Sequence, residues 1–167
     1  MKKEEYSKDT IEISYFDFLK EVYSGRIELI REMERVFGKD AVHNTIERYY
    51  EQRSVSSSSK MMEQEEPIST IEDFRTFLLK IDERPFMQKT MITEHPESDG
   101  KTVHRVVKQC MWADVFKELD ASDIGDIMLC KTDFATASVF HPNVKLTRSK
   151  TLMAGDDCCD FIYSWEE

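Results

Sequence analysis

The sequence predicts an α+β fold in which N-terminal helices pack on a mainly antiparallel C-terminal sheet. Apolar residues recur at helical spacing through most of residues 1–84, whereas β-rich runs separated by turn residues fill most of residues 85–167. Hydrophobic residues make up 40% of the chain and aromatic residues 11%, which is enough apolar surface for a core. We expect residues 1–167 to form a single domain whose second part carries the functional site.

The first two predicted helices lie before residue 53. An amphipathic helix is expected over residues 15–37, where apolar side chains recur every three or four positions: Phe16, Leu19, Tyr23, Ile27, Ile30, Met33 and Phe37. Gly38 provides a C-terminal stop, and Asp40 can cap a second helix that runs through Val42, Ile46 and Tyr49. Each helix has one apolar stripe and so needs a partner surface, most simply the predicted sheet.

A flexible loop is predicted over residues 53–66, because this segment combines a serine run with charges and shows no clear period. We expect a mobile surface connection there, with a lid over the site as the functional alternative. A third helix is predicted to begin at Ser69 or Thr70, and its apolar stripe consists of Ile71, Phe74, Phe77, Leu78 and Ile81. Pro85 cannot continue this helix.

The hydrophobic period changes after Pro85. Residues Phe86–Glu94 and Thr102–Cys110 are predicted to form a hairpin around the Asp99-Gly100 turn signal. Helical spacing returns just after Cys110, in Trp112, Val115, Phe116 and Leu119, and a second short helix is expected over residues 121–127. Cys110 is therefore expected at a strand-to-helix junction.

The remainder of the chain contains three further β-rich runs, which read LCKTDFATASVF, VKLTRSKTLM and CDFIYSW. Turn residues separate these runs at positions 141–143 and 154–157. Together with the hairpin, the three runs predict the antiparallel sheet.

The composition restricts the partners of the protein. With 33 acidic against 23 basic residues the formal charge is −10, which would repel a phosphate backbone, so we expect no nucleic acid partner. No stretch approaches the roughly 20 apolar residues of a membrane span, and the N-terminus lacks the apolar core of a secretory signal. We expect a cytoplasmic protein without a membrane partner, and we allow for a homo-oligomer. Its four cysteines are then expected to be free, catalytic or metal-bound rather than paired in disulfides.

All four cysteines lie in the last third of the chain, close to other reactive residues. At a strand-to-helix junction the helix dipole would lower the pKa of Cys110 and make it a nucleophile; the alternative is a small buried core residue. Cys130 and Asp133 would fall on opposite faces of an extended strand, whereas a bend at Lys131 would bring both to one mouth. Asp133 has apolar neighbours, so it is either a site acid or a turn cap.

Two further residues are candidates for binding. His141 precedes Pro142 in an extended or turn conformation and can act as base or ligand, with an exposed turn histidine as the alternative. Arg148 lies with Lys145 and Lys150 in a locally basic run that suits a small carboxylate. The cysteines and His141 would supply enough ligands for zinc, but no CxxC or HxxxH pair is present, so we expect no metal.

A set of residues from 110 to 163 forms a recognisable pattern. The set comprises Cys110, Ala113, Phe116, Gly125, Cys130, Asp133, Arg148, Thr151 to Met153, Gly155, Asp156, and Cys159 to Phe161. In this pattern the chain resembles the L-2-amino-thiazoline-4-carboxylic acid hydrolase family, while the front half matches only in its helical layout. The ending from Gly155 to Phe161 is also similar, more distantly, to small-molecule-binding 4-vinyl reductase type domains.

The resemblance implies hydrolytic opening of a cyclic isothiourea, from 2-amino-thiazoline-4-carboxylate to N-carbamoyl-cysteine. It implies Cys130 or Cys110 as the nucleophile, Asp133 as amidinium partner and proton shuttle, and Arg148 as the clamp for the substrate carboxylate. Cys159 completes the catalytic set, and Asp160 joins His141 and Arg148 in binding substrate. The partner is then a small-molecule carboxylate, and no cofactor is expected. A non-catalytic ligand-binding or sensor domain and a metal-binding scaffold are the alternatives.

Overall fold

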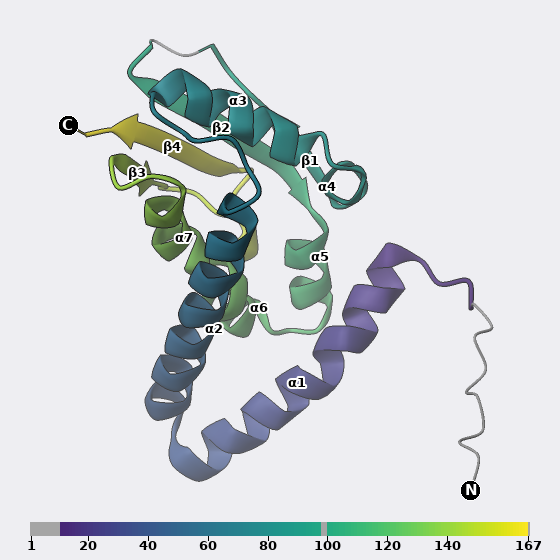
Figure 1. Cartoon of the computed structure of the whole chain (residues 1–167). Helices are drawn as coiled ribbons and strands as arrows, with labels where there is room; N and C mark the ends of the chain where they lie inside the picture. Colours follow the sequence, from purple (N-terminus) through teal and green to yellow (C-terminus); the bar gives the residue numbers. More distant parts are fainter. Residues whose placement is uncertain (1–10, 98–99, 167) are drawn as a thin grey trace, which may run out of the picture.

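The computed structural model describes residues 11–97 and 100–166 of the chain. Long helices precede a four-stranded sheet, and short helices lie between β2 and β4 (Figure 1). In chain order the elements are α1 (Tyr15–Phe37), α2 (Lys39–Met62), α3 (Ile71–Asp82), α4 (Pro85–Thr90), β1 (Met91–Glu94), β2 (Thr102–Cys110), α5 (Met111–Glu118), α6 (Ser122–Gly125), the π-helical turn η1 (Asp126–Cys130), α7 (Thr132–Phe140), β3 (Val144–Thr147), the 3₁₀ turn η2 (Leu152–Ala154) and β4 (Cys159–Trp165).

The first helix has the predicted bounds, and the second is longer than predicted. The side chain of Ser14 caps α1, and Gly38 ends it with φ at 86°, in a region that favours glycine. Gly38 is also the N-cap of α2, so Asp40 lies in the first turn rather than at the predicted capping position. Helix α2 continues to Met62, and the flexible loop predicted over residues 53–66 is therefore wrong over most of its length.

Packing against α7 explains why the serine run is helical. Ser54 Oγ lies 2.9 Å from Thr136 Oγ1 of α7, and Ser59 Oγ donates to the carbonyl oxygen of Val55 one turn earlier. The period of the segment is weak because serine contributes little apolar surface, yet tertiary contacts with α7 hold it helical. The connection between α2 and α3 is confined to residues 63–70.

Helix α3 confirms the prediction of its start. Thr70 and Asp73 form a capping box, in which the Thr70 hydroxyl accepts from the Asp73 N–H and the Asp73 carboxylate accepts from the Thr70 N–H. The strand predicted over Phe86–Glu94 is wrong in its first half, where α4 forms with Pro85 in its first turn. Proline is favoured at that position because the N–H it lacks has no partner within a helix.

The sheet is antiparallel throughout, with strand order β1-β2-β4-β3. The predicted hairpin of β1 and β2 is present, with a register shift between Ile92 and Thr93; Asp99 of its predicted turn lies outside the described residues. On β2 and β4 alternate residues are buried, so one face of the sheet packs against protein.

Two of the three C-terminal β predictions need correction. The run LCKTDFATASVF, residues 129–140, forms the end of η1 and then α7 instead of a strand. The alternation of apolar and polar residues over 135–139 suggested a strand, but the segment is helical and α7 packs along α2. In the run VKLTRSKTLM only Val144–Thr147 is a strand, whereas CDFIYSW forms β4 as predicted.

The core consists of two hydrophobic clusters that meet near the end of β2. One cluster joins α1 and the start of α2 to α5, α6, η1 and η2, and its centre includes Tyr23, Phe116 and Ile124. The other joins α3, α7 and the end of α2 to the buried face of the sheet. Helices therefore cover one face of an antiparallel sheet, which confirms the α+β prediction. Within the described residues, no helix has both the length and the apolar character that crossing a bilayer requires.

Candidate functional site

A cavity of about 250 Å³ lies where the two hydrophobic clusters meet. Its lining comes from β1, β2, α5, η1, α7, η2, β4 and the segment between β3 and η2: Met91, Arg105, Val107, Cys110, Trp112, Leu129, Cys130, Thr132, Asp133, Arg148, Met153, Cys159 and Phe161. Five of the seven predicted site residues are in this lining, namely Cys110, Cys130, Asp133, Arg148 and Cys159. Residues far apart in the sequence thus share one small, mostly apolar space.

An ion pair between Arg148 and Asp133 forms the polar centre of the cavity. Arg148 Nη1 donates to Asp133 Oδ2 at 2.7 Å, and Nη2 donates to the carbonyl oxygen of Cys130 at 3.1 Å. The Arg148 side chain is only 6% exposed, and its guanidinium lies 5.1 Å from the ring centres of both Phe134 and Phe161. These two cation–π contacts and the ion pair hold Arg148 in one orientation.

Asp133 is surrounded by protein and yet keeps access to water. About 38% of its side-chain surface is exposed, because the carboxyl group faces the open space of the cavity. Burial raises the pKa of Asp133 to about 6, although the charge of Arg148 and its hydrogen bond act in the opposite direction. The carboxylate is therefore close to its titration point at neutral pH, as a group that transfers protons needs to be.

Cys130 and Asp133 reach the same cavity because their segment is helical. The strand considered for this segment would have placed them on opposite faces, but η1 continues into α7 through Lys131. Residues three apart on a helix lie on the same side of it. Cys130 and Asp133 therefore line one cavity, as the alternative with a bend at Lys131 had predicted.

Thr151 links two of the cavity cysteines. Its hydroxyl lies 3.8 Å from Cys130 Sγ and 3.7 Å from Cys159 Sγ, and Cys159 Sγ also accepts from the backbone N–H of Leu152 at 3.2 Å. These contacts fix the position of the Cys159 sulfur at the start of β4.

Burial raises the pKa of two cavity thiols, Cys130 and Cys110, and so favours their protonated form. Burial raises the pKa of Cys130 to about 12, and the neighbouring charge of Asp133 adds to the rise. Cys110 does lie at the predicted junction, as the last residue of β2 and the N-cap of α5. The N–H of Ala113 acts to lower the pKa of Cys110, but burial outweighs it and raises the pKa. The expected lowering by the helix dipole is therefore wrong. All four cysteines are free of disulfides.

Two predicted binding residues lie outside the cavity lining. His141 follows α7, and its ring stacks on Trp165 at 4.5 Å between ring centres. Asp160 lies on β4, where it accepts hydrogen bonds from the backbone N–H groups of Ser149 and Lys150. Burial acts to raise the pKa of Asp160, but the hydrogen bonds from Ser149 and Lys150 outweigh it and lower the pKa. Asp160 thus anchors the segment that directly follows Arg148.

Arg105 is a cavity residue that the sequence analysis did not single out. It is 8% exposed, and its guanidinium makes a bidentate ion pair with Asp82 of α3 at 2.7 and 2.6 Å. His95 Nε2 lies 2.9 Å from the same carboxylate. A sequence signal was present, because Arg105 occupies an inward position between Val103 and Val107 on β2, where an apolar residue would be expected.

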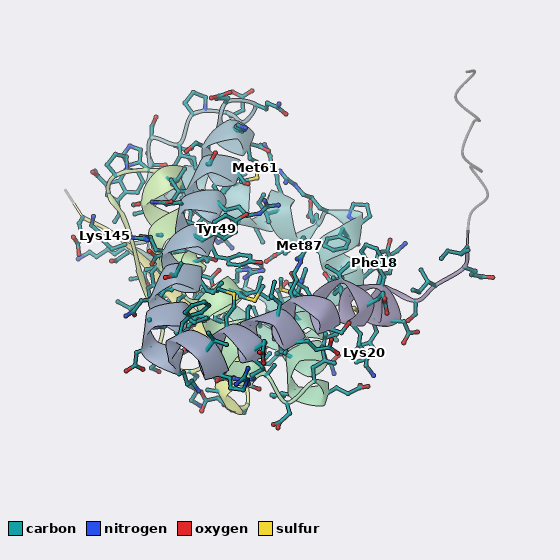
Figure 2. All side chains as sticks on the ribbon, turned by 90° about the horizontal axis from the view of Figure 1, so that it is seen from below. Phe18, Lys20, Tyr49, Met61, Met87 and Lys145 are labelled. Atoms are coloured by element: carbon teal, nitrogen blue, oxygen red, sulfur yellow. The ribbon has the colours of Figure 1, made fainter. Side chains whose placement is uncertain are left out.

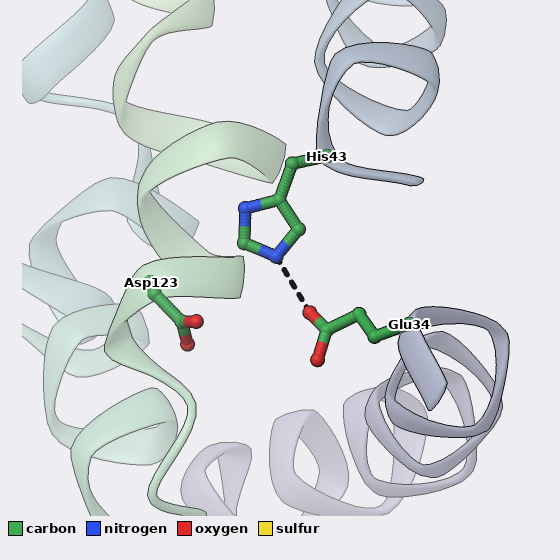
Figure 3. A group of neighbouring side chains, drawn as sticks. All are labelled: Glu34, His43 and Asp123. Atoms are coloured by element: carbon green, nitrogen blue, oxygen red, sulfur yellow. Dashed lines mark hydrogen bonds and ion pairs between the residues drawn. The ribbon is translucent and has the colours of Figure 1, made fainter. Parts of the chain in front are cut away.

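A zinc site of the kind considered from the sequence would require the side chains of the cysteines and His141 to lie close together. The structure brings Cys110, Cys130 and Cys159 to the cavity, and His141 lies elsewhere. Among the described residues one different group has metal-ligand geometry, with ligand atoms of Glu34, His43 and Asp123 within 4.8 Å of one another (Figure 3). Arg31 and Lys39 form ion pairs with these carboxylates. We therefore interpret the group as an ion-pair network that joins α1, α2 and α6.

Comparison with known proteins gives a structural neighbour and a family. No curated protein is similar enough in sequence to count as a match. Trafficking protein particle complex subunit 3 from Naegleria fowleri, in a crystal structure covalently bound to palmitic acid, shares 12% sequence identity with a TM-score of 0.52, over 90% of this chain and 97% of that chain. At this identity the likeness concerns the fold alone. The family model for L-2-amino-thiazoline-4-carboxylic acid hydrolase matches residues 18–163, most of the chain. The chain belongs to the L-2-amino-thiazoline-4-carboxylic acid hydrolase family.

Proposed function

We propose that this protein is a hydrolase that opens a small cyclic amidine or isothiourea, such as 2-amino-thiazoline-4-carboxylate. The observation that carries the proposal is the Asp133–Arg148 ion pair facing a small, mostly apolar cavity. The substrate carries an amidinium and a carboxylate on one ring. It can replace the internal ion pair with two new ones, its carboxylate on Arg148 and its amidinium on Asp133. Membership of the family supports the same reaction.

The chemistry follows from these contacts. Asp133 first holds the amidinium and then accepts a proton from a water molecule that attacks the amidine carbon. The proton on Asp133 passes to the ring sulfur as the bond between the amidine carbon and that sulfur breaks. The oxygen of the water loses its second proton to solvent and becomes the carbonyl oxygen of the product. The product is N-carbamoyl-cysteine with a free thiol. The apolar walls exclude other water and strengthen the electrostatic contacts within the cavity.

We favour attack by water over attack by a cavity cysteine. The raised pKa of Cys130, at about 12, and the raised pKa of Cys110 leave little thiolate at neutral pH. Cys159 remains the candidate for a covalent route, because the Leu152 N–H fixes its sulfur in the cavity lining. A Cys159→Ser variant that loses turnover while Cys130→Ser keeps it would assign the reaction to the covalent route.

The test is to incubate the purified protein with 2-amino-thiazoline-4-carboxylate and to follow new free thiol with a chromogenic disulfide. We expect thiol release to fall at least about 100-fold in Asp133→Asn, because general base catalysis contributes about 10²–10⁴-fold. Asp114→Asn is the matched control, since Asp114 is an exposed acid on α5 outside the cavity lining. Full activity in Asp133→Asn, or no release by the wild-type protein, would contradict the proposal.

A second candidate is a binding domain without turnover. The trafficking subunit of similar fold was crystallised covalently bound to palmitic acid, and the cavity here combines apolar walls with three cysteines. An acyl thioester on one of these cysteines is the corresponding expectation. Intact-mass measurement of the purified protein before and after hydroxylamine treatment separates the two candidates, because hydroxylamine removes a thioester-linked acyl group and leaves a free protein unchanged.

A further inference from the structure

A second cavity of about 330 Å³ adjoins the first, and three residues line both cavities. The shared residues are Met91, Arg105 and Asp133, so the carboxyl group of the ion pair lies at the boundary between the two spaces, whereas Arg148 lines the first alone. Beyond them the second cavity extends toward α3, α4 and the end of α2.

The strand and helix positions show that the second cavity continues the first along the sheet. On β4, Cys159 and Phe161 line the first cavity, and Tyr163 lines the second. Side chains two residues apart on a strand point to the same face and are about 7 Å apart. On α7, Asp133 lies at the boundary, and Thr136 and then Phe140 follow at helical spacing along the second cavity. Both elements therefore run past Asp133 from one cavity into the next.

The walls of the second cavity are mostly apolar and adaptable. Phe77, Leu78 and Phe140 supply a fixed part, in which the rings of Phe77 and Phe140 pack at 5.2 Å between centres. Met61 at the end of α2 and Met87 on α4, both labelled in Figure 2, supply a flexible part. Unbranched thioether side chains adapt to ligands of varied shape. Arg84 and Arg105 also line the second cavity, and Arg105 is paired with Asp82. The rest of the lining is mostly apolar and suits a flexible apolar group.

Size argues that the ring of 2-amino-thiazoline-4-carboxylate does not use both spaces. Sites for drug-sized ligands are about 300–1,000 Å³, a range that the two cavities reach together and that a single five-membered ring does not require. The second cavity adjoins Asp133 and is therefore within reach of a group attached to a ligand bound at that carboxylate.

We propose that the second cavity is a subsite for an apolar substituent, so that the preferred ligand is an amidine or isothiourea acid carrying a flexible apolar chain. This inference rests on the proposed function, because that function places the amidinium on Asp133. A substituent on the exocyclic nitrogen then begins at the boundary between the two cavities and enters the second one past Met91. The site then selects ligands by the length of their apolar substituent as well as by their charge.

The test compares 2-amino-thiazoline-4-carboxylate with derivatives that carry methyl, butyl or hexyl on the exocyclic nitrogen. Calorimetric titration of the wild-type protein should show Kd decreasing up to about fourfold for each added methylene until the cavity is filled. Met87→Trp, which fills the second cavity from α4, should abolish this dependence and leave Kd for the unsubstituted ring within about twofold. Gln88→Trp is the matched control, since Gln88 is exposed and lines neither cavity, and it should retain the wild-type dependence.

The Kd series tests the subsite, and thiol release tests the hydrolase activity, so the two proposals can fail separately. A Kd series that is flat or rises with chain length in the wild-type protein, absence of binding by every compound, or a dependence that survives in Met87→Trp would overturn the subsite. The wild-type series tests the proposal even if Met87→Trp does not fold. Thiol release is measured separately on the same compounds. A steep Kd series without thiol release would retain the subsite and reject the hydrolase, and release with a flat series would do the reverse.

Discussion

Asp133 combines two properties that determine the chemistry of the cavity. Its Oδ2 accepts a hydrogen bond from Arg148, and the residue lines both the first and the second cavity. Because burial opposes its charge while Arg148 supports it, the carboxyl group changes protonation near neutral pH. A single residue can therefore hold a cationic substrate group and also accept a proton.

The pH dependence of turnover follows from the pKa of Asp133, which burial raises to about 6. A general base must be ionised, so kcat/KM should fall about tenfold per pH unit below this value and be constant above it. The measurement is the pH profile of thiol release at low substrate concentration, from pH 4.5 to 8. A profile that rises as pH decreases would show that protonated Asp133 acts as an acid instead.

Alkylation tests the state of the cavity thiols. Since burial raises the pKa of Cys130 to about 12, its reaction with iodoacetamide at pH 7.5 should be at least about 100-fold slower than that of a free cysteine. The rate is measured by mass spectrometry of the peptide that contains Cys130. The same peptide in unfolded protein is the control and should react at the ordinary rate. Rapid alkylation of Cys130 in the folded protein would restore it as the nucleophile.

At the scale of elements, α6 is held against the cavity wall by close contact at Gly125. A Cβ atom on Gly125 would lie 2.7 Å from Met153 and from the ring of Phe116. The end of Met153 can move, but Phe116 is fully buried, and Met153 itself lines the cavity. The glycine is needed here for close approach of α6 to α5 and η2, not for its backbone freedom.

Paired glycine substitutions test this packing. Alanine in a helix usually gains about 1 kcal/mol over glycine, but overpacking a core costs about 1–3 kcal/mol. Gly125→Ala should therefore lower the free energy of unfolding. Gly25→Ala in α1, where a Cβ atom meets nothing within 4 Å, should raise it by about 0.5–1 kcal/mol. Urea unfolding measures both, and stabilisation by Gly125→Ala would contradict the packing argument.

The ion-pair network of α1, α2 and α6 makes stability depend on pH. Hydrogen bonds from Arg31 and Lys39 lower the pKa of Asp123 well below its usual range, against the opposing effect of burial. In the unfolded chain Asp123 protonates at its ordinary pKa of 3.8, so its stabilising contribution is complete above about pH 4 and is lost progressively as pH falls below it.

Asp123→Asn should thus lower the free energy of unfolding at pH 7 by at most about 1 kcal/mol, because the paired side chains are partly exposed. The difference from the wild-type protein should shrink when unfolding is measured at pH 3. Asp114→Asn, at an exposed position, serves as the control. A difference that is equal at both pH values would show that the network contributes nothing through charge.

At the scale of the whole molecule, both hydrophobic clusters draw on both halves of the chain. Tyr23 of α1 packs with Phe116 of α5, and Phe74 of α3 packs with Tyr163 of β4. Cys110 and Leu152 contact both clusters. We therefore expect the single domain predicted from the sequence to unfold in one step.

Scanning calorimetry tests this expectation. The calorimetric and van't Hoff enthalpies should agree for one transition, and separate fragments 1–84 and 85–167 should not fold. Each fragment would expose its part of both clusters to water. Two resolved transitions, or a folded fragment, would show that the chain contains two independent units.

The predictions from sequence succeeded where the local pattern was strong. The apolar stripes of α1 and α3 and the alternation of β2 were sufficient to locate these elements. The pattern failed at residues 53–62 and 132–140, where α2 and α7 are helical because they pack on each other. These contacts join positions some 80 residues apart, so the local sequence of either segment does not show that it is helical.

The sequence by itself determined the α+β class, the family pattern and most of the reactive side chains, because periodicity and residue type are local properties. Only the tertiary structure decided which of these side chains share a cavity, and it placed His141 and Asp160 outside and Arg105 inside. It also decided their protonation, raising the pKa of Cys110 where the sequence had predicted a lower one. Burial and distance arise from contacts between remote segments, and these contacts control the charge and the reach of every group in the site.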